Sequence, residues 1–207
     1  MTTIGIASLG CAKNLVDSEI ILGILKKHNA VIVNDPGKAE VIIVNTCGFI
    51  KEAQQESIET ILKAVALKTS GNVKKIIAAG CLTQLFGDEL CNQIPEVDGW
   101  VGINDFPKIA EILDEILSGK KVFKIASAPY IYDNSTPREI LTPHHYAYIK
   151  IAEGCDHLCS FCIIPAIKGK LRSRNTSSII AEAEYFISTG VKELILISQD
   201  STQYGKD

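Results

Sequence analysis

Short apolar runs alternate with longer stretches of helical periodicity through the first half of the chain. The predicted strands are runs rich in Val, Ile and Ala, at 3–9, 31–33, 41–44, 74–79 and 99–102. The predicted helices carry apolar residues three and four positions apart, at 14–28, 51–68, 83–93 and 105–117. Residues 41–44 are all β-branched, which is typical of a central strand buried on both faces. This alternation predicts an α/β fold with a doubly wound parallel sheet, flavodoxin- or Rossmann-like.

The pattern changes after residue 117. Residues 120–126 form a strand-like tail, and residues 128–143 are rich in proline and polar residues, as in a linker. We therefore expect a first domain over 1–127, a linker over 128–143 and a second domain over 144–207.

The second domain begins with an alternating run, 146–151, which predicts a strand. A helix is predicted to follow, capped by Thr176 or Ser177 and running to Thr189, with Glu182 and Glu184 on its exposed side. Residues 194–197 are the next predicted strand. These 64 residues give room for about two βα steps at roughly 30 residues per unit. A complete barrel needs roughly 200 residues or more, so we expect an incomplete barrel and no activity from this chain alone.

Composition and charge narrow the function classes. The chain has 207 residues, 46% hydrophobic and 22% charged, the profile of a folded soluble protein. Its net charge of −3 creates no strong field that would attract nucleic acid. No basic leader precedes the first apolar run, and no run approaches the roughly 20 apolar residues of a membrane span. We expect a cytoplasmic protein without a membrane partner, whose seven cysteines are reduced and available to a metal.

Three of these cysteines lie within one short loop. Cys155, Cys159 and Cys162 have C-x3-C-x2-C spacing directly after the first strand of the second domain. Such a loop can bind three irons of a [4Fe–4S] cluster and leave the fourth iron open. A zinc knuckle normally shows paired C-x2-C or histidine partners that complete four ligands. The spacing therefore favours an iron–sulfur site.

Three further cysteines follow different strands of the first domain. Cys11, Cys47 and Cys81 each come within three residues of a predicted strand end, next to a glycine. The ends of parallel strands meet at one edge, where open α/β sheets bind ligands, so these cysteines should converge into a second three-thiol site. The alternatives are buried cysteines that pack as small apolar residues, or a zinc site short of a ligand. Cys91 lies within a predicted helix and is expected to be core or partly exposed packing.

Several motifs resemble the methylthiotransferases, a family of radical S-adenosylmethionine (SAM) enzymes. They are L-G-C-A-K-N-L-V-D-S-E from Leu9, N-T-C-G-F-I from Asn45, A-G-C-L from Ala79, P-E-V-D-G from Pro95, Y-A-Y-I-K-I-A-E-G-C from Tyr146, I-I-P-A-I-K-G-K-L-R-S-R from Ile163 and S-Q-D-S-T-Q-Y-G from Ser198. The resemblance spans the chain and is greatest to the branch that modifies ribosomal protein S12. It implies a TIM-like radical SAM barrel after the first domain.

The resemblance also implies cofactors and a reaction. Cys155, Cys159 and Cys162 would hold the [4Fe–4S] cluster that binds and cleaves SAM, using an electron donor. Cys11, Cys47 and Cys81 would hold an auxiliary [4Fe–4S] cluster that carries the transferred sulfur. The product would be a methylthio group on the β-carbon of an aspartate in S12. The alternatives are a tRNA adenosine methylthiotransferase and an iron–sulfur electron-transfer module. The negative net charge does not favour a tRNA substrate.

Other candidate residues carry weaker predictions. Phe161 is a candidate to pack beside the SAM adenine, and Gln199 and Asp200 are candidates to bind its amino group at a strand end. The alternatives are core packing for Phe161 and a turn or cap for the other two. Lys170, Arg172 and Arg174 are expected on a solvated basic loop, and His157 at the surface.

Overall fold

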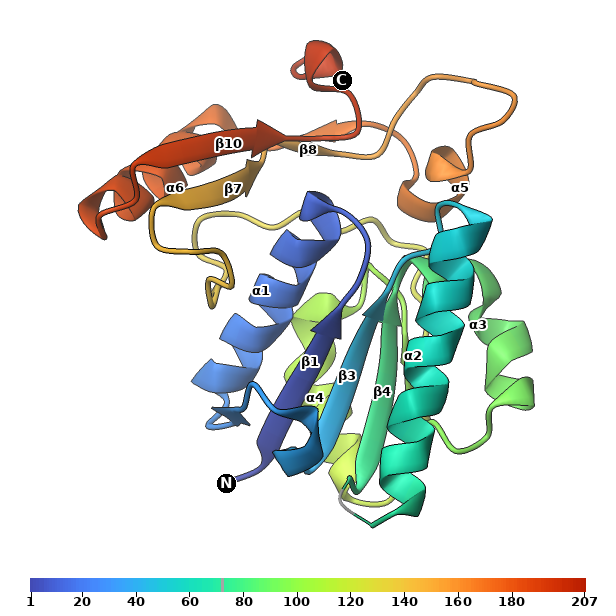
Figure 1. Cartoon of the computed structure of the whole chain (residues 1–207). Helices are drawn as coiled ribbons and strands as arrows, with labels where there is room; N and C mark the ends of the chain where they lie inside the picture. The colour runs from blue at the N-terminus through green and yellow to red at the C-terminus, as the bar shows by residue number, and fades with distance from the viewer. Residues whose placement is uncertain (72) are drawn as a thin grey trace.

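The computed structural model describes residues 1–71 and 73–207, and its main feature is a six-stranded parallel sheet (Figure 1). The strands are β1 (Thr3–Ser8), β2 (Val31–Ile32), β3 (Val41–Thr46), β4 (Lys75–Gly80), β5 (Gly99–Val101) and β6 (Val122–Lys124), in the order β2-β1-β3-β4-β5-β6. Strand β2 lies on one side of β1, and β3 to β6 follow in order on its other side. The predicted doubly wound α/β sheet is therefore confirmed.

Helices cover both faces of this sheet. They are α1 (Ala12–Lys27), α2 (Lys51–Thr69), α3 (Cys81–Gln93) and α4 (Ile109–Leu117), with short 3-10 turns at Pro36–Lys38 and Phe106–Lys108. Ile43 of β3 packs in the core beneath α1 and α4, whereas Ile42 and Val44 pack in the core beneath α2 and α3. The continuous apolar run therefore fills two cores, as expected for a central strand.

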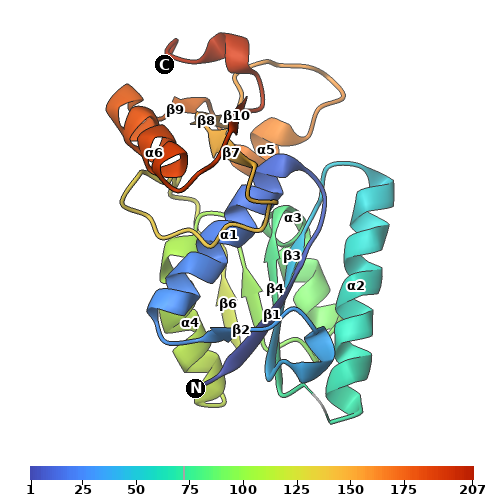
Figure 2. The same ribbon diagram turned by 60° about the vertical axis from the view of Figure 1, so that its left-hand side comes forward.

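Helix α1 is buried on more than its sheet side. Its buried residues include the charged Asp17 and Glu19, because the C-terminal part of the chain packs on the face that points away from the sheet (Figure 2). The sequence predicted only the stripe that faces the sheet. Burial of two carboxylates requires compensating partners, and both find them in residues beyond 137.

The C-terminal part has a second, smaller sheet. Strands β7 (Tyr146–Lys150) and β10 (Glu193–Ile197) pair in parallel and are joined through α6 (Thr176–Ser188), which is the βαβ step expected at the start of a barrel. Between them lie β8 (Ala152–Glu153), α5 (Ile164–Lys168) and β9 (Arg172–Ser173), with β8 and β9 antiparallel, and the turn Ser201–Gln203 follows β10. This part lies over the edge to which β1, β3 and β4 point (Figure 1).

Three local predictions for the second part are wrong. Glu182 is 6% exposed and Arg174 is 3% exposed, because they pair with each other at 2.6 Å beneath α6. The N-cap of α6 is Asn175, whose side chain accepts the backbone N–H of Ser177. Periodicity places Glu182 outward, but it cannot anticipate a cationic partner brought from another segment.

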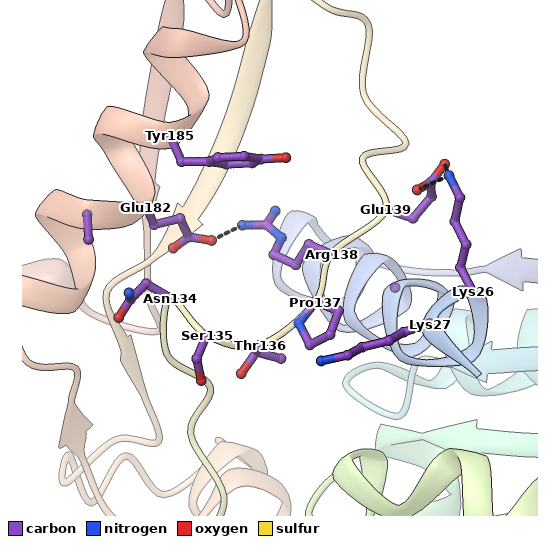
Figure 3. Close-up of a pocket in the computed structure, with 12 residues that line it drawn as sticks. Lys26, Lys27, Asn134, Ser135, Thr136, Pro137, Arg138, Glu139, Glu182 and Tyr185 are labelled. Atoms are coloured by element: carbon purple, nitrogen blue, oxygen red, sulfur yellow. Dashed lines mark hydrogen bonds and ion pairs between the residues drawn. The ribbon is translucent and has the colours of Figure 1, made fainter. Parts of the chain in front are cut away.

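The segment predicted as a linker is fixed between the two sheets. The Arg138 guanidinium pairs with Glu182 of α6 (Figure 3). It also pairs with Glu19 of α1 and lies over the Phe186 ring. Tyr132 is also buried and donates its hydroxyl to Glu182. Residues 128–143 therefore tie the two parts of the chain together rather than separating them.

Candidate functional site

The cysteines that follow three strands line one cavity of about 380 Å³. Cys11 begins the turn into α1, Cys47 follows β3, and Cys81 is the first residue of α3, directly after β4. The cavity opens at the carboxyl edge of the sheet, where adjacent parallel strands bring the three loops together. The predicted convergence of these thiols is confirmed, whereas their role as ligands remains a prediction.

Glycines allow the three loops to approach this closely. Gly10 has φ +85°, and a Cβ built on it would lie 2.7 Å from the Cys47 Cβ and 2.8 Å from its Sγ. A Cβ on Gly48 would lie 3.0 Å from the Leu82 backbone and 3.1 Å from the carbonyl carbon of Cys81. The glycine beside each of these positions is therefore a packing requirement of the cavity.

Buried polar side chains hold the same loops in place. The Asn14 amide donates to the carbonyls of Leu9 (2.6 Å) and Asn45 (3.1 Å), and the Asn45 amide donates back to the carbonyl of Asn14 (2.9 Å). The Ser57 hydroxyl accepts the backbone N–H of Cys47 at 2.9 Å and donates to its carbonyl at 3.0 Å. These bonds fix the Cys11 and Cys47 loops without using either thiol.

The opposite wall of the cavity comes from the C-terminal part. Ile164, Ile167 and Lys168 of α5 line it, together with Gln199 at the end of β10. The Gln199 amide nitrogen donates to Glu153 at 2.5 Å, while its amide oxygen is buried and has no partner in the described structure. Gln199 was predicted as a SAM contact from its strand-end position, and the structure places it beside the first thiol set.

Four buried charges lie behind this wall. The Lys150 ammonium contacts Asp17 at 2.5 Å and Glu153 at 2.6 Å, and the Lys168 ammonium lies 3.2 Å from Asp17 and 3.6 Å from Glu153. All four side chains are about 95% buried. The two cations balance the two anions, which is the condition for burying such a group.

Burial and these charges shift several pKa values. Desolvation raises the pKa of the Cys81 thiol to about 11, although the Lys168 ammonium acts in the opposite direction. Burial would also raise the pKa of Glu153, but Lys150 and Lys168 outweigh it and hold that pKa well below the ordinary value. The Cys81 thiol is therefore kept protonated unless a metal replaces its proton, as a bound metal ion does.

The second thiol set lies on an extended loop between β8 and α5, which projects from the molecule in Figure 1. Cys159 is exposed, Cys155 and Cys162 are partly exposed, and the Cys162 amide donates to the Cys159 carbonyl at 3.0 Å. The side chains of Leu158 and Phe161 are 95% and 91% exposed. Phe161 is therefore not core packing, and its place beside the adenine stays a prediction.

A contact between His157 and Asp200 joins the cysteine loop to the segment after β10. The His157 Nε2 lies 2.7 Å from an Asp200 carboxylate oxygen. Hydrogen bonds from Thr202 and His157 lower the pKa of Asp200 to about 2. His157 is half exposed, as predicted. Asp200 also accepts the backbone N–H of Thr202, so Asp200 both stabilises the turn after β10 and contacts the cysteine loop.

Both thiol sets fit the chemistry of an iron–sulfur cube. Residues 1–71 and 73–207 contain no group of three or more His, Cys, Asp or Glu side chains close enough to share one metal ion. In a cube each thiolate binds a different iron, so the ligands are more widely spaced than those of a single ion. The first set adds a largely apolar cavity wall, and the second lies on a loop with exposed or partly exposed thiols.

A larger cavity lies elsewhere in the described structure. It has a volume of about 550 Å³ and is bounded by α1, residues 134–139 and α6 (Figure 3). Its charged side chains are largely paired with one another, as Lys26 is with Glu139, and no cysteine lines it. We therefore place the candidate site at the smaller cavity, which combines reactive groups from both parts of the chain.

Sequence reasoning missed the residues that position the thiols. Asn14, Asn45 and Lys168 all fall inside the methylthiotransferase-like motifs, but their spacing alone does not indicate a role. Ser57 sits within a predicted helix and had no signal. Their roles depend on contacts between distant segments, which local periodicity does not record.

Comparison with known proteins identifies the family. The family model described as Uncharacterized protein family UPF0004 matches residues 3–102. The whole chain is 49% identical over 207 residues to a protein named ribosomal protein uS12 methylthiotransferase RimO from Thermoanaerobacter sp. (strain X514), covering 47% of that relative. The proteins of the same name from Trichlorobacter lovleyi and Clostridioides difficile (strain 630) are 48% and 46% identical over 99% and 100% of this chain, which covers 46% and 47% of them.

The chain is a relative of the methylthiotransferases. The motif resemblance is thereby confirmed, including its branch. The chain spans about half the length of the curated relatives it matches.

Solved structures support the fold of this chain. The radical SAM methyltransferase TsrM from Kitasatospora setae matches 97% of the chain and is itself covered to 48%, with a TM-score of 0.64 and 12% identity. The cobalamin-dependent SAM radical enzyme OxsB matches 97% of the chain and is covered to 34%, with a TM-score of 0.57 and 10% identity. At such identities the likeness concerns the fold alone. None of the helices in the described ranges combines the length and apolarity that a membrane span requires.

Proposed function

We propose that this chain is the first half of a radical SAM methylthiotransferase that places a methylthio group on the β-carbon of an aspartate in ribosomal protein S12. Support comes from relatives that carry this name and are 46–49% identical across the chain. The chain's own motifs, which run from the first thiol set to the segment after β10, support the same branch.

The observation that carries the proposal is the shared cavity of Cys11, Cys47 and Cys81, walled on one side by α5 of the radical SAM part. We propose that these thiols hold one [4Fe–4S] cluster and that Cys155, Cys159 and Cys162 hold another. Bound there, the clusters would supply the sulfur to be transferred and the electron for cleaving SAM.

The chain's own residues would orient these groups and exclude water. Ile164 and Ile167 close the first site with apolar surface, and Lys168 places an ammonium beside it. Phe161, Gln199 and Asp200 stay our candidates for contacts to SAM. The domains would be 1–127 and 144–207, joined through 128–143.

We also propose the partners of this enzyme and the compartment in which it works. S12 would be the protein substrate, an electron donor would reduce the cluster, and the enzyme would work in the cytoplasm. A tRNA substrate is disfavoured because the chain has a net charge of −3, and binding to a phosphate backbone depends on cationic surface.

The decisive experiment uses an enzyme that carries this chain as its first half, loaded with iron and sulfide and reduced without oxygen. It would be supplied with SAM and, separately, with S12 or tRNA. We expect 5′-deoxyadenosine and a methylthio adduct on an S12 aspartate, detected by mass spectrometry. Methylthiolated tRNA with unmodified S12 would overturn the substrate. Reversible reduction without 5′-deoxyadenosine would instead favour an electron-transfer module.

A further inference from the structure

Lys168 is the member of the buried charged group that borders the thiol cavity. Asp17, Lys150 and Glu153 line a small neighbouring space on the inner side of that group, and Lys168 lines both that space and the cavity of Cys11, Cys47 and Cys81. Lys168 therefore connects the thiol cavity to the buried carboxylates that balance its charge.

Lys168 is fixed in this position. Its side chain is 5% exposed, and its ammonium contacts Asp17 at 3.2 Å and Glu153 at 3.6 Å. Burial opposes its charged form, but these two carboxylates raise its pKa well above the ordinary value of lysine, so the charge is permanent.

The same wall also contains a polar group without a partner. The buried amide oxygen of Gln199 has no hydrogen-bond donor in the described structure, and Gln199 lines the thiol cavity. Lys13 also lines the cavity, anchored to the Ser198 carbonyl at 3.3 Å. Buried polar groups normally have partners, so this wall is built to meet an occupant.

We propose that Lys168 is a positioning residue for the first thiol site, holding a fixed positive charge against the group that Cys11, Cys47 and Cys81 bind. The inference rests on the proposed function, since it takes that group to be an iron–sulfur cluster. Three thiolates outweigh the positive core of a cube, so the loaded site is anionic and reduction makes it more so. Lys168 therefore stabilises the reduced state more than the oxidised state.

The test isolates the first site. Cys155, Cys159 and Cys162 are replaced by Ala in the 207-residue chain, so that iron loads only at Cys11, Cys47 and Cys81. In this background Lys168→Met is compared with Lys168→Arg and with Lys170→Met, whose lysine is exposed two residues away. The readout is the midpoint potential from a dithionite titration followed by electron paramagnetic resonance.

We expect Lys168→Met to be harder to reduce, with about a tenfold lower ratio of reduced to oxidised cluster at a fixed potential. Lys168→Arg should retain the parent potential, and Lys170→Met should not change it. If Lys168→Met loads poorly, the double variant Lys168→Met/Asp17→Asn keeps the buried group neutral. It should load and still shift in the same direction, by less.

The outcomes separate two failures. If the parent loads no iron at Cys11, Cys47 and Cys81, the proposed function fails and this inference falls with it. If the parent loads iron and the Lys168→Met and double variants keep the potential of Lys170→Met, the inference alone is overturned. A purely structural role for Lys168 would change loading or unfolding without moving the potential.

Discussion

The backbone of Gly10 packs directly on the side chain of Cys47. A Cβ at Gly10 would lie 2.7 Å from the Cys47 Cβ, closer than such atoms approach in folded proteins, and Gly10 also has φ +85°. The β1–α1 turn and the loop after β3 are therefore fitted to one another at the position where two of the predicted ligands meet. This contact links the conformation of the chain to the geometry of the site.

Replacing Gly10 by Ala tests this contact. The Ala must adopt a left-handed conformation, which costs about 1–2 kcal/mol, and must also displace Cys47, which adds about 1–3 kcal/mol. Gly119→Ala is the matched control, because Gly119 has φ +94° and a Cβ added there would meet no other segment within 4 Å. Both variants would be compared by urea unfolding and by iron content after reconstitution. Equal iron content in the two would show that the Gly10–Cys47 contact does not shape the site.

Arg138 should be more important for stability than its exposed neighbour Lys26. Arg138→Ala leaves the buried Glu19 without its cation and Glu182 with Arg174 alone, and breaking a buried pair typically costs about 3–5 kcal/mol. The Lys26–Glu139 pair is largely exposed, so Lys26→Ala should cost less than about 1 kcal/mol. Urea midpoints of the two variants provide the test. Similar midpoints would mean that residues 128–143 do not hold the two sheets together.

Asp98 should make the free energy of unfolding depend on pH. Although burial opposes it, hydrogen bonds from Lys68 and the Ile76 amide lower the pKa of Asp98 below its ordinary value. A carboxyl whose pKa is lower when folded stabilises the fold above its unfolded pKa, and this stabilisation is lost as the pH falls through the folded value. Asp98→Asn should therefore be destabilising at neutral pH by about 1.5–3 kcal/mol, and less so near pH 3.

The comparison for Asp98 is the difference in unfolding free energy between parent and variant, measured by urea titration at both pH values. Glu96→Gln is the control, since Glu96 is exposed two residues away. A difference for Asp98→Asn that stays constant down to about pH 3 would contradict the assigned pairing.

The sequence predicted the features that depend on short-range pattern. The β-branched run at 41–44 predicted a central strand, and cysteines directly after separate strands predicted a common edge; both are present. It failed where a residue's environment comes from another part of the chain. Glu182 was predicted to be exposed because helical periodicity contains no information about Arg138 and Arg174, which come from other segments. Only one face of α1 was predicted to be buried, because the C-terminal part that covers its other face is distant in sequence.

The two thiol sets should load iron independently. Replacing Cys11, Cys47 and Cys81 together by Ala should remove about four irons per chain and leave about four at the other set, and replacing Cys155, Cys159 and Cys162 should do the converse. Cys91→Ala is the matched control, because that thiol donates to the Asp88 carbonyl within its own helix and packs against the core. It should leave the iron content unchanged. Iron and sulfide would be counted per chain after anaerobic reconstitution. Loss of all iron from either triple variant would mean that the sites form only together, and retention of all iron would reject the assigned ligands.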